Sequence, residues 1–160
     1  MDETYVRVQG KWCDLYRAID AEGNLVASRL SEKRDMEAAP LFFKQALAIV
    51  SQPPERVITD GHTSYPRAVH EILGGQVLHR TNHYLHNRLE QDHRGIKQRY
   101  DPMHGFGNFG SATRFCSAFD ELRNYLRPRS TLGEASSRPE QRRAFLDRCT
   151  ALKALVQVAL

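Results

Sequence analysis

The fold is decided by the stretch Arg56-Val57-Ile58-Thr59-Asp60-Gly61, a short β-branched run that a glycine ends. Such a run is typical of a buried strand. A helix then begins near Thr63 or Ser64, either of which can cap it, and ends at residues 74–75, which are both glycine. Residues 76–79 predict one more short strand. A strand, a helix and a strand at this spacing indicate parallel pairing through a right-handed crossover.

The segments before this unit predict three antiparallel strands and a helix. Residues 4–9, 12–19 and 25–30 have strand-like patterns and are separated by turns. A helical period begins near Asp35. The apolar side of that helix comprises Ala39, Phe42, Phe43, Ala46, Leu47 and Val50.

The segments after the unit predict three helices. We expect one over residues 87–100 and one over residues 111–126, the second with Phe115, Phe119, Leu122 and Leu126 facing inward. Residues 127–140 predict a linker, and residues 141–160 an amphipathic helix. The apolar stripe of this last helix, which we expect to be core or a cover within the chain, comprises Phe145, Cys149, Leu152 and Val156. The whole order predicts an α/β fold, a mixed five-stranded sheet flanked by helices with a C-terminal helical extension.

The charge of the chain is uneven. Its 160 residues carry a net charge of +4, and residues 81–160 hold 13 basic against 8 acidic side chains. Arginine, which suits bidentate phosphate contacts, makes up 18 of the 23 basic residues. This favours a nucleic-acid partner, although an arginine-rich genome explains it equally well. The apolar runs are too short for a transmembrane helix, and three distant cysteines fit a reducing cytosol.

Three acidic residues occupy positions where α/β folds place their sites. Asp2 begins the first strand, Asp60 ends the buried strand, and Glu90 lies in the first turn of the helix after the last strand. Strand ends and helix starts converge at the carboxyl edge of such a sheet. Three carboxylates there repel one another unless a cation is present, and Mg²⁺ prefers oxygen ligands. Two such ions would clamp the attacking and leaving oxygens of a phosphoryl transfer.

Each acid also has an ordinary explanation. Glu90 can form a capping box with Asn87 or an ion pair with Arg94 at i+4, Asp60 can belong to a plain turn, and Asp2 can be a solvated terminus. Taken singly, these explanations are favoured, whereas the three acids together favour a metal site. A zinc site is disfavoured because no cysteine lies near the four candidate histidines His79, His83, His86 and His93.

Four separated blocks of the chain carry further information, because they occur in a characteristic order. They include Asp2-Glu3-Thr4-Tyr5-Val6-Arg7-Val8, Lys11-Trp12 with residues 15–20, Val57-Ile58-Thr59-Asp60 and Glu90-Gln91-Asp92-His93-Arg94-Gly95-Ile96-Lys97. In this combination the chain resembles the bacterial insertion-sequence-six family of transposases, from Asp2 to about Tyr125. The resemblance implies a ribonuclease-H-like integrase core that uses Asp, Asp and Glu.

This resemblance implies the roles of the three acids and the division of the chain. Asp2, Asp60 and Glu90 match the catalytic, metal-binding acids, which hold two Mg²⁺ ions for which Mn²⁺ can substitute. Residues 1–126 would form the DDE catalytic domain, without the DNA-end-binding region that family members carry upstream. Residues 127–140 would then be the linker and residues 141–160 the C-terminal amphipathic helix.

Basic residues crowd the helix of Glu90. Lys97 matches the basic residue that the family carries seven positions after its glutamate, which is two turns or about 10.5 Å along the same helix face. The residues that we expect to contact DNA are Lys97, Arg94, Arg88, Arg99 and His93. His93 is also placed to shape the metal site, with an ordinary surface histidine as the alternative, and an ordinary charged helix face is the alternative for the others.

A glycine-rich loop follows this helix, Gly105-Phe106-Gly107-Asn108-Phe109-Gly110. It has the spacing of a dinucleotide fingerprint, but it follows a helix instead of a strand. We therefore expect a flexible DNA-facing loop in which Phe106 and Phe109 stack or pack.

The sequence thus predicts the catalytic domain of a DNA transposase, which cuts the 3′ ends of an element and joins them to target DNA. We expect this enzyme to act on DNA in the bacterial cytoplasm, associated with the nucleoid and away from any membrane. A homo-oligomer is expected in the active state, because two element ends must be held. The alternative is a truncated, catalytically impaired transposase that binds DNA or a partner transposase without cutting.

Overall fold

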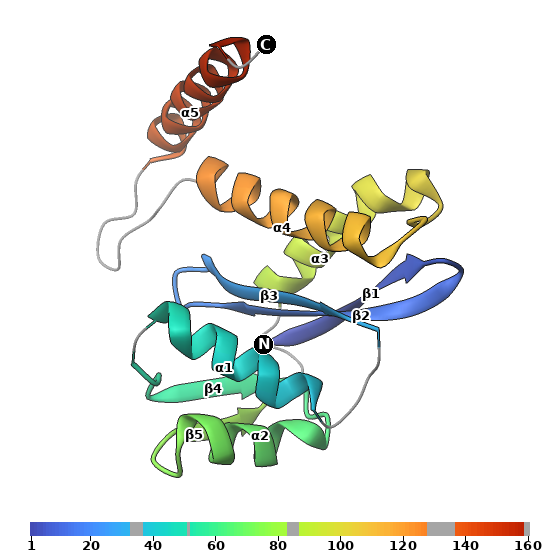
Figure 1. Cartoon of the computed structure of the whole chain (residues 1–160). Helices are drawn as coiled ribbons and strands as arrows, with labels where there is room; N and C mark the ends of the chain where they lie inside the picture. Colours follow the sequence, from blue (N-terminus) through green and yellow to red (C-terminus); the bar gives the residue numbers. More distant parts are fainter. Residues whose placement is uncertain (33–36, 51, 83–86, 128–136, 159–160) are drawn as a thin grey trace.

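Five strands form the centre of the fold (Figure 1). The computed structural model describes residues 1–32, 37–50, 52–82, 87–127 and 137–158. An antiparallel sheet in the order β1-β2-β3 consists of β1 (Asp2–Val8), β2 (Lys11–Ile19) and β3 (Leu25–Ser31). β4 (Arg56–Thr59) and β5 (Leu78–Thr81) pair in parallel, which confirms the crossover that the sequence predicts.

Met1 joins the two groups of strands. Its α-amino nitrogen donates a hydrogen bond to the carbonyl oxygen of Ile58 at 2.7 Å. The start of β1 therefore lies beside the end of β4, in the middle of the five strands. The prediction of a mixed α/β fold with five strands is confirmed, and these strands form a three-stranded antiparallel sheet and a two-stranded parallel sheet.

Helices cover both faces of the antiparallel sheet (Figure 1). On one face lie α1 (Ala38–Val50) and, packed against α1, α2 (Ser64–Leu73). On the other face lie α3 (Asn87–Tyr100), the short helix η1 (Asp101–Met103) and α4 (Phe109–Leu126). The C-terminal helix, α5 (Arg138–Val158), extends away from the body beyond the end of α4.

The period of two along β1 explains why the sheet separates two hydrophobic clusters. Val6 and Val8 point to the face of α3 and α4, where they pack with Leu15, Ile96 and Cys116. The cluster on the opposite face joins β2 and β3 to α1 and α2, and it includes Tyr16, Ala27, Phe42, Phe43, Tyr65 and Val69. Met1, just before β1, packs in this second cluster, and Val6 and Val8 pack in the first, so both ends of β1 are held by hydrophobic contacts.

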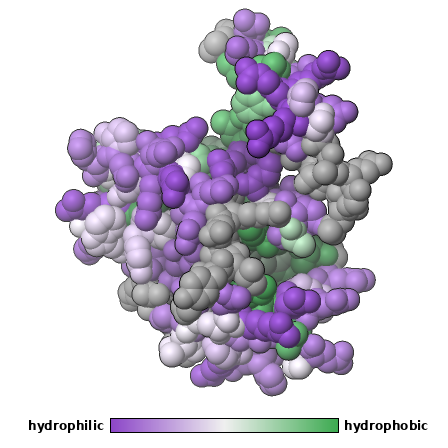
Figure 2. Space-filling view, turned by 180° about the vertical axis from the view of Figure 1, so that it is seen from behind, coloured by the Kyte–Doolittle hydropathy of each residue, from purple (hydrophilic) through white to green (hydrophobic). Residues whose placement is uncertain are grey.

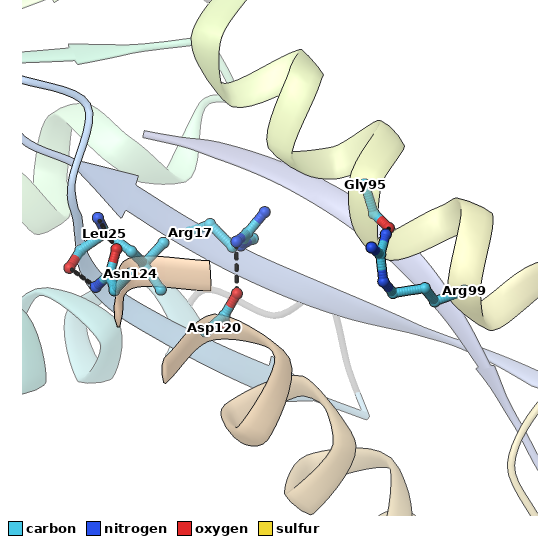
Figure 3. Close-up of polar contacts among 6 residues, drawn as sticks. All are labelled: Arg17, Leu25, Gly95, Arg99, Asp120 and Asn124. Atoms are coloured by element: carbon cyan, nitrogen blue, oxygen red, sulfur yellow. Dashed lines mark hydrogen bonds and ion pairs between the residues drawn. The ribbon is translucent and has the colours of Figure 1, made fainter. Parts of the chain in front are cut away.

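Polar contacts tie α4 to the sheet (Figure 3). The guanidinium of Arg17, which is 0% exposed, lies 2.5 Å from the carboxylate of Asp120. The side chain of Asn124 both accepts a hydrogen bond from the amide of Leu25 and donates one to its carbonyl oxygen, each at 2.9 Å. These contacts fix how α4 is rotated about its axis.

That rotation differs from the prediction for α4. Its buried residues are Ala112, Cys116 and Asp120, whereas Leu122 is 44% exposed. The physical reason is the buried charge of Arg17, which requires the carboxylate of Asp120 on the inward side. The assignment of Leu122 to the inward face was wrong.

Two further expectations about helices need correction. Thr63 is the N-cap residue of α2 but makes no side-chain capping hydrogen bond, and the hydroxyl of Ser64 instead lies 2.8 Å from Nδ1 of His62. The stripe of α5 is not core, because no residue in the described part of this helix is buried. Phe145 is 41% exposed and Val156 is 53% exposed. Figure 2 shows apolar residues at the surface of this helix.

The glycine-rich loop is held against β1. The amide of Phe106 donates to the carbonyl oxygen of Arg7 at 2.9 Å, and the carbonyl oxygen of Phe106 accepts from the amide of Gln9 at 2.8 Å. The Phe106 ring is buried and stacks on Tyr100 with 5.8 Å between ring centroids. Phe106 therefore packs in the core, one of the two roles expected for it.

In the part of the chain that the structure describes, no helix has the length and apolar character needed to cross a membrane.

Candidate active site

Asp2 and Asp60 meet where β1 and β4 lie side by side. The charges of both carboxylates raise the pKa of the α-amino group of Met1. This amino group is hydrogen-bonded to the carbonyl oxygen of Ile58, two residues before Asp60. Burial lowers the pKa of this amino group to about 6, and the attraction of the two carboxylates opposes that shift. Two of the three predicted acids are therefore brought to one place by the sheet.

Local hydrogen bonds orient each carboxylate. Oδ1 of Asp2 accepts from the amide of Glu3 at 2.8 Å, and Oδ1 of Asp60 accepts from the amide of His62 at 3.3 Å. Gly61, between Asp60 and His62, has a φ of 96°, which favours glycine. The turn after β4 thus folds back on Asp60 and leaves it half-buried.

His93 connects α3 to Asp2. It is 7% exposed, and its Nδ1 lies 3.8 Å from Oδ2 of Asp2. An imidazole buried in this way lies against the carboxylate and not on an open DNA-facing surface. The burial of His93 contradicts the alternative of a surface histidine, and its contact with Asp2 is consistent with a role in shaping the metal site.

Glu90 lies on the exposed side of α3. Within the described residues, it forms no ion pair with Arg94, so that ordinary explanation of its position does not apply. The described residues also contain no group of three or more His, Cys, Asp or Glu side chains close enough together to hold a metal ion. The structure therefore brings Asp2 and Asp60 together but does not bring Glu90 into one cluster with them.

Tyr65 is a site residue that the sequence pattern did not reveal. Its hydroxyl donates a hydrogen bond to Oε1 of Glu3, and the ring is fully buried. Burial, the hydrogen bond to Glu3 and the charges of Glu3 and Asp60 raise the pKa of this hydroxyl far above its usual range. Tyr65 therefore remains a neutral donor behind the two aspartates. The one feature of the sequence that could have indicated the burial of Tyr65 was its position on the apolar side of α2.

The predicted basic residues differ in their surroundings. Arg94 and Lys97 are exposed on α3. Arg99 turns back on the protein, where its Nη1 donates to the carbonyl oxygen of Gly95 at 2.9 Å (Figure 3) and its guanidinium lies 5.5 Å from the centroid of the Phe119 ring. The side chain of Arg88 lies outside the described part of the structure, as do His83 and His86.

The residues present fit a hard divalent cation. Asp2 and Asp60 offer carboxylate oxygens, the donor type that Mg²⁺ and Mn²⁺ prefer. The charges of Asp2 and Asp60 both favour the positive form of the Met1 α-amino group, although burial lowers its pKa overall. Asp2, Asp60 and, from α3, Glu90 are the residues that would hold such an ion.

Comparison with known sequences identifies the family of this chain. The sequence profile of the DDE domain family DDE_Tnp_IS240 matches residues 1–129. The chain belongs to this DDE domain family. The matched region contains β1 to β5, α1 to α4 and all three candidate acids.

Relatives of this DDE domain include transposases. The transposase for insertion sequence-like element IS431mec of Staphylococcus aureus strain Mu50 is 42% identical over 103 residues, which are 62% of this chain and 46% of that protein. The transposase for insertion sequence element IS257 in transposon Tn4003, also from Staphylococcus aureus, matches equally well. The chain thus spans about half the length of these relatives. An uncharacterized protein of Yersinia pseudotuberculosis, pYV0051, is 39% identical over 75 residues, 46% of this chain and 70% of that protein.

A solved structure shows the same fold. A chain of the simian T-cell lymphotropic virus intasome, determined by cryoEM in complex with PP2A regulatory subunit B56 gamma, is similar with a TM-score of 0.58. The match has 12% sequence identity and covers 88% of this DDE domain chain and 51% of the other. The fold is therefore integrase-like and ribonuclease-H-like, as the family resemblance implied.

Proposed function

We propose that this DDE domain catalyses metal-dependent phosphoryl transfer on DNA, cutting the 3′ ends of an insertion element and joining them to target DNA. The observation that carries the proposal is the meeting of Asp2 and Asp60 at the junction of β1 and β4. The transposase relatives support the reaction class, and the proposed substrate is DNA. The enzyme would act in the bacterial cytoplasm at the nucleoid, as a homo-oligomer that holds two element ends.

The catalytic residues in this proposal are Asp2, Asp60 and Glu90, which would hold two Mg²⁺ ions. Bound divalent ions stabilise charge on the transferring phosphoryl group and lower the pKa of an attacking water. The remaining task of the protein is positioning, because phosphoryl transfer of this kind needs no covalent protein intermediate.

The chain's own residues would perform that positioning. The amides of Glu3 and His62 orient the carboxylates of Asp2 and Asp60 through a hydrogen bond to one oxygen of each, and His93 lies against the second oxygen of Asp2. Lys97 and Arg94 are exposed on the helix of Glu90, where they would contact DNA phosphates.

The test is a joining reaction run in reverse on a branched oligonucleotide that mimics the joined product. In a preassembled branch the strands are already joined, so the enzyme does not have to recognise element ends. The catalytic domain alone can therefore be assayed on this substrate. We expect Mg²⁺- or Mn²⁺-dependent resolution of the branch by the wild-type chain. Glu90→Gln, which removes a charge from an exposed position, should abolish the reaction without changing the thermal midpoint Tm.

Glu121→Gln is the matched control, because Glu121 is an exposed glutamate of α4 that is not one of the three candidate acids. It should retain wild-type activity. Activity that survives Glu90→Gln would contradict the assignment of Glu90.

A second candidate is a transposase-derived protein that binds DNA or a partner transposase without cutting. The observation that favours it is the lack, within the described residues, of a preformed group of three metal-binding side chains. The same experiment separates the two, because the non-cutting protein would bind the branched DNA in the presence of Mn²⁺ and leave it intact.

A further inference from the structure

A groove of about 670 Å³ lies at the hairpin end of β1 and β2, beside the C-terminal end of α3. Its lining residues are Tyr5, Arg7, Trp12, Lys97, Tyr100, Asp101 and His104. Among these, Tyr5, Arg7 and Trp12 belong to the sheet and are not among the residues that the family resemblance marks as functional. The groove therefore combines aromatic rings from β1 and β2 with a cationic residue of the helix that carries Glu90.

Two aromatic rings of the groove are exposed. Trp12 is 62% exposed and Tyr5 is 42% exposed, whereas Tyr16, the other aromatic residue of β1 and β2, is buried. Leaving a tryptophan ring in water costs free energy roughly in proportion to its apolar area. Exposed aromatic side chains next to cationic ones are typical of surfaces on which nucleobases stack.

The cationic residues of the groove are held close to these rings. The guanidinium carbon of Arg7 lies 6.0 Å from the centroid of the Trp12 ring, a cation–π distance. Lys97 is exposed on the other wall. With one acid, Asp101, against Arg7 and Lys97, the lining has a net positive charge that suits a phosphate backbone.

The floor of the groove is rigid. The hydroxyl of Tyr100 accepts a hydrogen bond from the amide of Arg7 at 2.6 Å, and its ring stacks on Phe106. Gly105 lies so close to β1 that an added Cβ would be 3.0 Å from the carbonyl oxygen of Arg7. The exposed rings therefore stand on a fixed support, which lowers the entropic cost of binding.

We propose that this groove binds an unpaired segment of a DNA strand, with one base stacked on Trp12 and phosphates contacted by Arg7 and Lys97. The inference rests on the proposed function, in which DNA reaches Glu90. Lys97 lies seven residues after Glu90, about 10.5 Å along the helix. At about 3.4 Å per stacked nucleotide, that span corresponds to about three nucleotides. A base-paired duplex is disfavoured because its bases stack on one another and do not present a free face to Trp12.

The chain offers a built-in reporter for this test. Trp12 is its one tryptophan, so intrinsic tryptophan fluorescence reports on the groove alone. We would titrate the full chain with a mixed-sequence single-stranded DNA oligonucleotide and with the matching blunt duplex, in EDTA so that no catalysis occurs. The single strand should quench Trp12, whereas the duplex should not. Equal quenching by the duplex, or no binding of the single strand, would overturn the inference.

Variants extend the test through fluorescence anisotropy of a labelled single strand. Trp12→Ala should weaken binding roughly tenfold, whereas Trp12→Phe, which keeps an aromatic face, should recover most of the affinity. Tyr125→Ala is the matched control, since Tyr125 is 43% exposed on α4, away from the groove, and should bind as the wild type does. Unchanged affinity in Trp12→Ala would also overturn the inference.

The outcomes separate this inference from the proposed function. Branch resolution by a chain whose Trp12 is not quenched would overturn the groove and leave the catalytic proposal standing. Quenching and the loss of affinity in Trp12→Ala, in a chain that does not resolve the branch with any metal, would support the groove and contradict the catalytic proposal.

Discussion

Arg17 lies directly opposite Asp2 in the antiparallel ladder between β1 and β2. Residues opposed in this way place their side chains on the same face of the sheet. The guanidinium of Arg17 is paired with Asp120 of α4 at 2.5 Å, on the face where His93 lies against Asp2. The strand position that carries the first candidate acid is therefore supported by a buried ion pair with α4.

Breaking this ion pair should destabilise the domain strongly. Asp120→Ala would leave the fully buried charge of Arg17 without its partner, which costs about 3–5 kcal/mol of the free energy of unfolding. Urea denaturation measures the loss. Glu71→Ala is the control, because it breaks the exposed ion pair of Glu71 with Arg67 and should change stability little. Equal stability of Asp120→Ala and the wild type would contradict the packing of α4 described above.

The glycine-rich loop provides a matched pair of substitutions. Gly105 has a φ of 117°, and a Cβ there would meet the carbonyl oxygen of Arg7 at 3.0 Å. Gly105→Ala should therefore lower stability by at least about 1 kcal/mol. Gly107→Ala, where no atom lies within 4 Å of the added Cβ, should be close to neutral. Thermal unfolding of the two variants distinguishes them, and a larger loss in Gly107→Ala would be inconsistent with this loop conformation.

Cysteine reactivity should follow burial. Burial, together with the charge of Asp120, raises the pKa of the Cys116 thiol to about 12, from an ordinary value of 9.0. Burial is also the main cause that raises the pKa of Cys13. Because the thiolate is the reactive form, iodoacetamide at mildly alkaline pH should modify Cys149 of α5 first, as peptide mass spectrometry would show. Modification of Cys116 at the rate of Cys149 would contradict the burial of Cys116 on the inward side of α4.

The raised pKa of Cys116 also sets the sign of a pH effect. In the unfolded chain the thiol loses its proton near pH 9, whereas in the folded chain it keeps it until about pH 12. The unfolded state therefore binds fewer protons in this window, and stability falls as the pH rises through it. Cys116→Ala should reduce that fall, as urea denaturation at pH 8 and pH 10 would measure.

The order of strands and helices could be predicted because it depends on local patterns. One such pattern is the alternation of Thr4, Val6 and Val8, which predicts a strand that ends at a turn. Another is the β-branched run before Asp60, which predicts a strand that ends at a glycine. The parallel pairing of β4 with β5 follows from the crossover rule. The meeting of Asp2 and Asp60 follows in turn from that topology.

Contacts between distant residues could not be predicted in the same way. Asp120 faces inward because of Arg17, 103 residues earlier in the chain, and the apolar period of α4 contains no sign of that partner. The burial of His93 against Asp2 and the exposure of Trp12 likewise depend on how α3 and the hairpin of β1 and β2 pack. Local periodicity indicates which side of a helix or strand is apolar. The burial or exposure of a particular side chain depends in addition on which distant element packs against that side.

The account depends most on Asp2 and Asp60 forming a site for a divalent cation. The most direct measurement is Mn²⁺ binding to the full chain by electron paramagnetic resonance, in the absence of DNA. We predict saturable binding at millimolar Mn²⁺ or below that is weakened roughly tenfold or more by Asp2→Asn and by Asp60→Asn. Asp147→Asn, at an exposed position of α5, should bind as the wild type does. No saturable binding at millimolar Mn²⁺, or binding that both aspartate variants retain in full, would contradict the account.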